Sequence, residues 1–411
     1  MSFLSPYKNL ERQVVMVIVA EFFIQLVNAT FMNMLPLYLD HIHYKNEQIA
    51  SFISFRFLGV FLLALPIGVF IKGKKVKPLF YMSCVGVPLF ALSILYFVEQ
   101  GNILMIYVSQ LLWGASFTFM QIPILPFVLR HCSAANQTAG IALSYSTWSF
   151  AGIVSGILIY FLDFFNPILF DERMVLIIFS VLGFLGIVAL MFAGINEIRA
   201  QEKEEKPSYK LSQYDWGAIV KALIPTLIIA IGAGLTIPLI SLFFKQVHHM
   251  DKGAFSVYSS IAALLVAWGA LLVPVIKNNI GYRIAVPSTQ ILAIVSLMAL
   301  GTTQYYNQMP IAVVIAVVCY LLRQPLMNLA GPMTSEIVMN YVGEKNREIV
   351  SSLTAAIWSG SWFFSGLLSQ VMFANGMQFV NIFLTTSLIY LLGVVGFVFL
   401  IRDYDKKISS K

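Results

Sequence analysis

The sequence predicts an all-α membrane protein with twelve transmembrane helices in two six-helix halves and with both termini in the cytoplasm. Hydrophobic residues make up 59% of the 411 residues and charged residues only 11%, whereas soluble domains carry about 25% charged residues. The apolar runs are about 20 to 27 residues long, enough for a helix to cross a hydrocarbon core of roughly 30 Å. The shorter alternating segments of a transmembrane β-barrel do not appear. We therefore expect a multi-pass protein of a plasma membrane, most simply a bacterial inner membrane.

Apolar runs between charged or Gly/Pro breaks define the expected helices. In the first half they lie near 14–39, 48–71, 77–98, 103–129, 138–164 and 173–196. In the second half they lie near 217–245, 254–276, 282–303, 310–340, 349–374 and 377–401. The stretch between the halves, "NEIRAQEKEEKPSYKLSQYDW", has mixed charges and no apolar periodicity. The sequence thus predicts an N-terminal bundle over 1–196, a cytoplasmic linker over 197–216 and a C-terminal bundle over 217–411.

The distribution of basic residues predicts the orientation. Most of the 26 Lys and Arg residues lie at the two termini, in the linker and in the loops on that same side. The opposite side carries only Lys45, Arg173, Lys245 and Lys252. Because cytoplasmic loops are enriched in Lys and Arg, both termini are expected in the cytoplasm. The net charge of +7 follows from this bias, and we expect no nucleic-acid partner.

An internal repeat relates the two halves. A shift of 210 residues places Trp148 on Trp358, and the pair Ser155-Gly156 on Ser365-Gly366. Six-helix halves related in this way are typical of parallel repeats in transporters, whose substrate binds between the halves near the bilayer midplane. The glycines of the fifth helix and "GAG" at 232–234 favour close approach of helices over contact with a ligand.

Two loops carry a related motif. After the second helix, "GVFIKGKKVK" begins at Gly68 and includes Lys72; after the eighth, "PVIKNNIGYR" keeps Gly281 and Arg283 in the same register. With these loops and its two halves, the chain resembles the major facilitator superfamily of secondary transporters over nearly its whole length. The family has Asp where Lys72 stands. A loosely characterised bacterial branch of the family is similar to "GAGLTIPLISLFFK" and to "RQPLMN…GPMTSEIVMNYV" in this chain.

The resemblance implies a small-molecule transporter that works by alternating access, with helices 1 and 10 lining a central cavity. It makes Gly68, Lys72, Gly281 and Arg283 candidate gating-loop residues. We expect a gradient of protons as the driving force and no cofactor or metal. No ATP-binding loop is found in the sequence, which favours a gradient as the driving force; ATP-driven pumping would need a partner chain. We expect no ATPase subunit, and we expect a monomer.

A polar stripe interrupts the first helix. In "EFFIQLVNATFMNMLPLYL", Glu21, Gln25 and Asn28 follow one another by four and three residues, so they share one helical face. An acidic group at the centre of a lipid-facing helix costs roughly 2.5 to 3.5 kcal/mol, so this face is expected against protein or water. Glu21 is our candidate for the proton-coupling group, with a permanently hydrated or ion-paired carboxylate as the alternative. Gln25 and Asn28 are candidate substrate contacts, or hydrogen-bonding partners of a neighbouring helix.

Two arginines lie inside predicted helices. Arg323 is near the middle of the tenth helix, where it needs an acidic partner, backbone carbonyls or an anionic substrate; Asn328 lies close by. Arg56 lies in the second helix and either contacts the substrate or snorkels to the interface. Further candidate substrate contacts are polar or aromatic residues on presumed cavity helices: Gln110, Gln121, Tyr145, Trp148, Trp358 and Trp362.

The leading functional hypothesis is proton-coupled export of a small amphipathic organic solute. Movement of an organic anion by the intramembrane arginines, by uptake or exchange, and translocation of a lipid on the same fold are the alternatives. An enzyme is not expected. The histidines His41, His43, His248 and His249 lack the spacing of a helical zinc pair, and "GAS" at 114–116 lacks the following glycine of rhomboid-type proteases.

Overall fold

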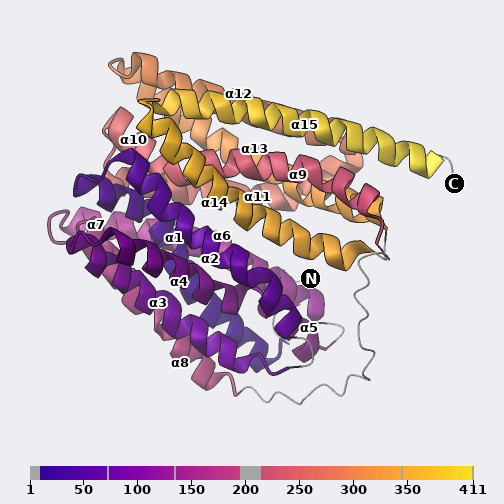
Figure 1. Cartoon of the computed structure of the whole chain (residues 1–411), viewed down its shortest axis with the longest axis horizontal. Helices are drawn as coiled ribbons and strands as arrows, with labels where there is room; N and C mark the ends of the chain where they lie inside the picture. The colour runs from indigo at the N-terminus through magenta and orange to yellow at the C-terminus, as the bar shows by residue number, and fades with distance from the viewer. Residues whose placement is uncertain (1–9, 72–73, 134–135, 195–213, 344–345, 410–411) are drawn as a thin grey trace. The chain divides into compact units, whose positions relative to one another are not determined.

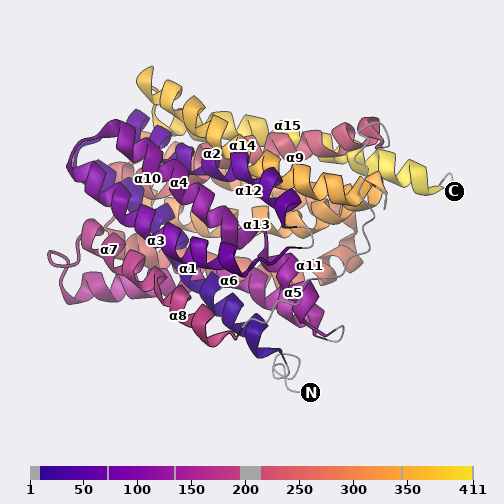
Figure 2. The same cartoon turned by 60° about the horizontal axis from the view of Figure 1, so that its bottom comes forward.

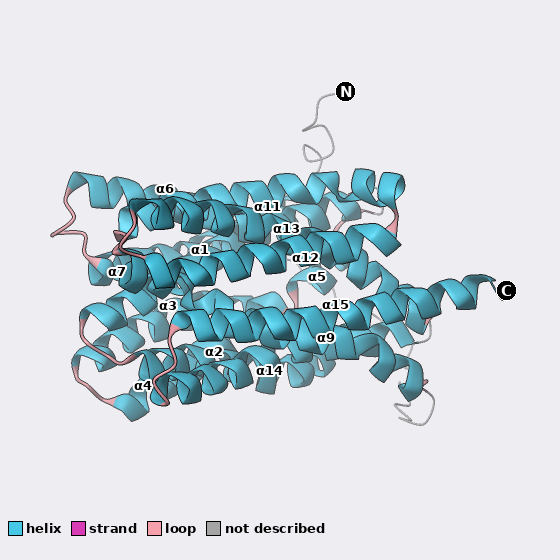
Figure 3. Cartoon of the chain, turned by 90° about the horizontal axis from the view of Figure 1, so that it is seen from above, coloured by secondary structure: helices cyan, strands magenta, loops and turns pink. Residues whose placement is uncertain are grey.

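The chain folds into helices joined by short loops. The structure is a computed structural model that describes residues 10–71, 74–133, 136–194, 214–343 and 346–409, and no strand occurs among them (Figure 3). Lys72 and the predicted linker at 197–216, apart from its last three residues, lie outside these ranges.

Every expected apolar run is helical. The first set of helices comprises α1 (Arg12–His41), α2 (Asn46–Phe70), α3 (Lys77–Glu99), α4 (Ile103–Gln121), α5 (Ile124–His131), α6 (Gln137–Phe165), α7 (Glu172–Gly183) and α8 (Leu185–Phe192). The second set comprises α9 (Trp216–Thr236), η3 (Ile237–Leu239), α10 (Ile240–His248), α11 (Lys252–Ile280), α12 (Tyr282–Thr302), η4 (Thr303–Tyr306), α13 (Pro310–Val342), α14 (Arg347–Ala374) and α15 (Phe379–Ser409) (Figure 1).

Three runs expected as single helices are divided. The run near 103–129 is interrupted at Pro123, directly before α5. The run near 217–245 is interrupted by the short 3₁₀ helix η3, which contains Pro238 and separates α9 from α10. Proline removes a backbone donor and disfavours a continuous α-helix. The third break, at Phe184 between α7 and α8, follows Gly183, which packs closely against Val27 and Pro88.

α15 continues beyond the predicted end at 401. Its polar last turns are held by side chains of other helices. Lys221 Nζ and Tyr341 Oη donate to Asp403 Oδ2 at 2.7 and 2.5 Å, and Arg283 Nε donates to Asp405 at 2.5 Å. These contacts extend the helix where hydropathy alone predicts its end.

Among the described residues, eleven helical segments are long and apolar enough to cross a membrane. The eleventh expected helix, α14, has 28 residues but is not among them. Its sequence "IWSGSWFFSGLLSQ" mixes Ser, Gly, Trp and Gln with the apolar residues, which lowers its mean hydropathy. The count of twelve membrane helices therefore stays a prediction.

The helices form two compact units. Unit 1 comprises Met1–Tyr44, Phe55–Lys206 and Lys252–Ser260; unit 2 comprises Lys45–Ser54, Pro207–Asp251 and Ile261–Lys411. Within unit 1, α1 packs against α6, α7 and α8, and α3 packs against α4. Within unit 2, α9 packs against α14 and α15, and α12 packs against α13 and α15 (Figures 1 and 2). α2 and α11 each contribute their first turns to one unit and the rest to the other.

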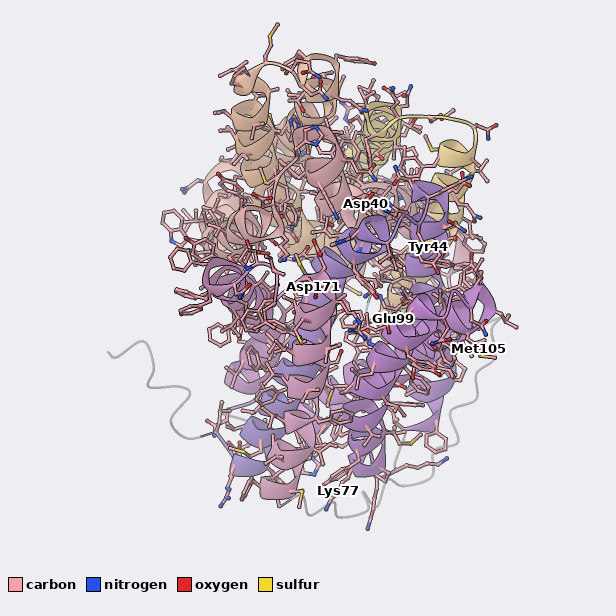
Figure 4. All side chains as sticks on the ribbon, turned by 90° about the vertical axis from the view of Figure 1, so that its left-hand side faces the viewer. Asp40, Tyr44, Lys77, Glu99, Met105 and Asp171 are labelled. Carbon is pink, nitrogen blue, oxygen red and sulfur yellow. The ribbon has the colours of Figure 1, made fainter. Side chains whose placement is uncertain are left out.

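Charged and polar side chains gather at one end of unit 1. Asp40, Tyr44, Glu99 and Asp171 lie at this end, whereas Lys77, the first residue of α3, lies at the opposite end (Figure 4). His41 Nδ1 and Glu172 Oε2 are 2.8 Å apart, and Arg173 pairs with Glu99. The ends of α1, α3 and α7 are thus held together by ion pairs and hydrogen bonds.

Two glycines bring the backbones of α2 and α4 together in unit 1. A Cβ added to Gly114 would collide with the backbone carbonyl of Arg56, and one added to Gly59 would collide with the Leu111 carbonyl and lie 2.8 Å from the Ala115 nitrogen. Small residues allow helices in membranes to approach in this way. This crossing sets the position of Arg56.

We expect Gly59→Ala to destabilise the protein because the new methyl group meets backbone atoms that cannot rotate away. Overpacking of this kind costs about 1 to 3 kcal/mol, which lowers the midpoint of thermal unfolding of the purified protein. The matched control is Gly68→Ala in the same helix, where an added Cβ has no atom within 4 Å. Equal midpoints for both variants would contradict the close crossing.

Candidate functional site

The polar stripe of α1 is buried within the protein. Glu21, Gln25 and Asn28 are 6%, 7% and 5% exposed. Asn28 Nδ2 donates to Gln25 Oε1 at 3.3 Å, and Ser144 Oγ of α6 donates to Glu21 Oε2 at 2.8 Å. The stripe therefore contacts other protein groups, and helix–helix hydrogen bonding accounts for part of it.

Glu21 has a neutral partner. Ser144 Oγ donates to its carboxylate, whereas Thr147 Oγ1, one turn along α6, donates to the backbone oxygen of Ser144 at 2.7 Å. Among the described residues, no basic side chain pairs with it. An ion-paired carboxylate was one alternative for Glu21. The described residues do not form such a pair. Buried without a cation, this group is suited to exist in both protonation states.

Arg56 is buried and does not snorkel. Arg56 is 4% exposed, and its guanidinium contacts the sulfur of Met32 on α1. The guanidinium carbon lies 4.5 Å from the ring centroid of Trp113 and 4.8 Å from that of Phe57. No carboxylate pairs with it among the residues that the structure describes. A sulfur and two π faces leave most of its five N–H donors without an oxygen acceptor.

Two further donors lie on α4. The side chains of Gln110 and Trp113 are 1% exposed, and Gln110 Nε2 and Trp113 Nε1 have no hydrogen-bond partner among the described residues. Trp113 also stacks on Phe31 and Phe117, with ring centroids 6.3 and 5.8 Å away. Trp113 was not among the residues predicted from the sequence, although it lies three positions after Gln110 and thus on the same helical face.

Arg323 is held by neutral groups in unit 2. It is 1% exposed; Nη1 donates to Gln324 Oε1 at 2.7 Å and Nη2 to the hydroxyl of Tyr390 at 3.0 Å. Tyr390 in turn packs on Gly232, where a Cβ would lie 2.6 Å from the ring. In the described part of the chain no carboxylate pairs with Arg323, and its Nε lacks a partner.

The remaining predicted contacts are not gathered into these buried clusters. Tyr145 and Trp148 are 73% and 55% exposed. The others that are exposed are Gln121, Asn328 and Trp358, while Trp362 is half-buried. Asn328 donates to the backbone oxygen of Gln324 at 2.8 Å. Their role as substrate contacts stays a prediction.

The predicted gating loops differ in how much of them is described. Gly68 lies in the last turns of α2, and Lys72 lies outside the described ranges. Between α11 and α12, Gly281 has φ +73°, a conformation that favours glycine. Arg283 pairs with Asp405 at 2.5 Å, and Lys277 Nζ donates to both oxygens of Glu336 at 2.7 and 2.9 Å. These bonds to Glu336, with Tyr282 alongside, raise the pKa of Lys277.

Long apolar helices with a few buried charges are typical of a multi-pass membrane protein. The family model of the Major Facilitator Superfamily matches residues 17–366. The chain belongs to this superfamily. Comparison of the sequence with curated proteins gives no match.

Solved structures share the fold at low identity. A bacterial homologue of the human lysosomal transporter Spinster, in an inward-facing and unoccupied conformation, has a TM-score of 0.70 and 12% identity over 96% of this chain and 97% of its own. A POT family transporter in complex with 5-aminolevulinic acid has a TM-score of 0.75 and 14% identity, covering 95% and 96%. A D-xylose–proton symporter has a TM-score of 0.73 and 10% identity, covering 94% and 96%. The fold is thus that of membrane transporters of varied substrates.

Proposed function

We propose that this protein is a proton-coupled secondary transporter that moves a small amphipathic organic solute by alternating access. It acts as a monomer in a plasma membrane, most simply a bacterial inner membrane, with twelve spans and cytoplasmic termini. Export is the direction that the sequence analysis favours and is part of the proposal. Membership of the superfamily supports transport, and the surroundings of Glu21 support the coupling.

The observation that carries the proton coupling is the environment of Glu21. A carboxylate buried in a membrane helix is costly and usually functional. Its hydroxyl partner Ser144 donates to the charged form and can instead accept from the neutral form by rotating its O–H. Both protonation states of Glu21 are thus accommodated without rearrangement of a salt bridge.

A second candidate function, transport of an organic anion, is favoured by the two buried arginines. Neither Arg56 nor Arg323 pairs with a carboxylate among the described residues. Each is a positive charge in a low-dielectric surrounding that an anionic solute would compensate. The two candidates are compatible, because a proton and an organic anion can be moved by one transporter.

Purified protein reconstituted into liposomes that contain a pH-sensitive dye tests the proposal. We expect at least one of benzoate, tetraphenylphosphonium and benzamide to change the internal pH faster than in empty liposomes. These probes separate anionic, cationic and neutral solutes. A fluorescent phospholipid in the same liposomes tests the lipid alternative. Lipid movement without any solute-dependent proton movement would overturn the proposal in favour of a lipid translocator.

A further inference from the structure

We propose that Arg56, Gln110 and Trp113 form a carboxylate-binding subsite in unit 1, and that the transported solute is an organic monocarboxylate with an apolar body. The proposal rests on the proposed transport function and names the chemistry of its solute. It assigns a role to Trp113 and separates the roles of the two buried arginines.

Close packing of α2 and α4 places Arg56 against Trp113, and Gln110 lies on the same face of α4 as Trp113. Gly114 lies against the backbone carbonyl of Arg56, with the carbonyl carbon 2.9 Å from an added Cβ. Gln110 is one turn before Gly114 on the same face of α4, and Trp113 directly precedes it. The guanidinium of Arg56 reaches the Trp113 ring at 4.5 Å. The position of the indole N–H is thereby fixed within a few ångströms of the positive charge.

The polar groups of this subsite are unused donors. Gln110 Nε2 and Trp113 Nε1 have no hydrogen-bond partner among the described residues, where the Arg56 guanidinium contacts a sulfur and two aromatic rings. Leaving a buried donor without a hydrogen bond destabilises the protein. A carboxylate offers acceptors on two oxygens and matches the planar guanidinium in a bidentate arrangement. One anion therefore satisfies the charge and the neutral donors together.

Arg323 is less suited to this role. Two of its nitrogens already donate to oxygen atoms, of Gln324 and Tyr390. These links join α13 to α15, so Arg323 is assigned to holding unit 2 together. Among the described residues, Arg56 makes no hydrogen bond to an oxygen atom, so its N–H groups are available to a ligand.

The walls of the subsite favour an apolar solute body. Phe31, Trp113 and Phe117 form a column of aromatic rings, and Met32 lies against the guanidinium. Aromatic and methionine side chains provide adaptable apolar contact. An inorganic anion would satisfy the donors but would gain nothing from these walls.

Thermal unfolding of the full-length protein in detergent tests the subsite. The probes are benzoate and hexanoate, with benzamide as the uncharged match for benzoate and chloride and phosphate as inorganic anions. We expect the carboxylates, and neither benzamide nor the inorganic anions, to raise the unfolding midpoint. The midpoint shift should need about a hundredfold more carboxylate with Arg56→Gln. That change equals about 2.7 kcal/mol, which is within the range for removing one partner of a buried charge pair. The midpoint shift should need about tenfold more with Trp113→Phe, which keeps the ring and removes one N–H donor.

Arg173→Gln, which removes a cation of unit 1 that pairs with Glu99, is the matched control and should respond to the carboxylates as the wild type does. If Arg56→Gln fails to fold, the carboxylate response of Trp113→Phe and Gln110→Met is used as the test instead. The subsite is wrong if neither carboxylate stabilises the wild type, if chloride or phosphate stabilises it as well as benzoate does, or if the Arg56 and Trp113 variants respond unchanged. Loss of the response in Arg323→Gln alone would move the site to unit 2. Proton movement driven only by the cation or the neutral probe would overturn this inference while leaving the proposed function intact; carboxylate binding without proton movement would do the reverse.

Discussion

Replacement of Glu21 by glutamine should abolish proton-driven accumulation of solute while leaving solute exchange across the membrane. Glutamine keeps the size and the acceptor oxygen that Ser144 Oγ reaches at 2.8 Å, so the fold and the hydrogen bond to α6 persist. It cannot take up or release a proton. The variant therefore resembles the protonated state of Glu21 permanently, and uphill transport should fall to the level of empty liposomes.

The measurement compares two modes of transport in the same liposomes: accumulation driven by an imposed pH gradient, and exchange of labelled for unlabelled solute without a gradient. The matched control is Glu172→Gln, which neutralises another buried carboxylate of unit 1, one that pairs with His41 at 2.8 Å. It should retain both modes. A Glu21→Gln variant that still concentrates the solute against its gradient would show that coupling resides elsewhere.

Sequence periodicity predicted the helices well but not their interruptions. Hydropathy defined every apolar run, because a helix in a bilayer must be apolar over about 20 residues. The break at Pro238 has a local cause in the sequence, whereas the break at Phe184 adjoins Gly183, whose neighbours Val27 and Pro88 come from distant parts of the chain. The last turns of α15 depend in the same way on partners such as Lys221 and Arg283, which hydropathy does not register.

The candidate site was predicted in part. The spacing of Glu21, Gln25 and Asn28 gave the buried stripe, because one helical face is readable from sequence. Whether Arg56 snorkels depends on how far its neighbours cover it, which only the packing of α1, α2 and α4 decides. Trp113 was not predicted, because most tryptophans in membrane helices only pack against neighbouring side chains. Two structural features distinguish it: its ring centroid lies 4.5 Å from the guanidinium carbon of Arg56, and its indole N–H has no hydrogen-bond partner among the described residues.

Glu21, Arg56 and Arg323 share one property: in the described part of the chain, each contacts neutral groups of the protein. Glu21 has a hydroxyl, Arg323 has an amide and a phenol, and Arg56 has sulfur and aromatic rings. A structural salt bridge would neutralise such charges permanently, and breaking it costs about 3 to 5 kcal/mol. Charges without permanent counter-ions are available to a proton or an anion that comes and goes. This is the condition that a coupled transporter has to meet.

Leucine at either of the two repeat-related glycines, Gly156 or Gly366, should slow transport by about tenfold or more. A Cβ on Gly156 of α6 would collide with the Ser260 hydroxyl and lie 2.5 Å from the Ser256 carbonyl oxygen, in the first turns of α11. A Cβ on Gly366 of α14 would collide with Ser54 and lie 3.2 Å from the Ala50 carbonyl oxygen, in the first turns of α2. The Ser-Gly pairs that reveal the repeat thus lie at two similar close approaches of helices.

A leucine side chain can be accommodated only if the paired helices separate, which removes the arrangement that the glycines permit. Overpacking by a single side chain costs about 1 to 3 kcal/mol, so each variant should transport at least about tenfold more slowly. The matched control is Gly331→Leu in α13, where an added Cβ has no atom within 4 Å. The test compares the transport rates and the thermal unfolding midpoints of Gly156→Leu and Gly366→Leu with those of Gly331→Leu. Wild-type transport by Gly156→Leu or Gly366→Leu would mean that the corresponding close approach is not needed in the transport cycle, and that the repeated Ser-Gly pairs record only the common origin of the two halves.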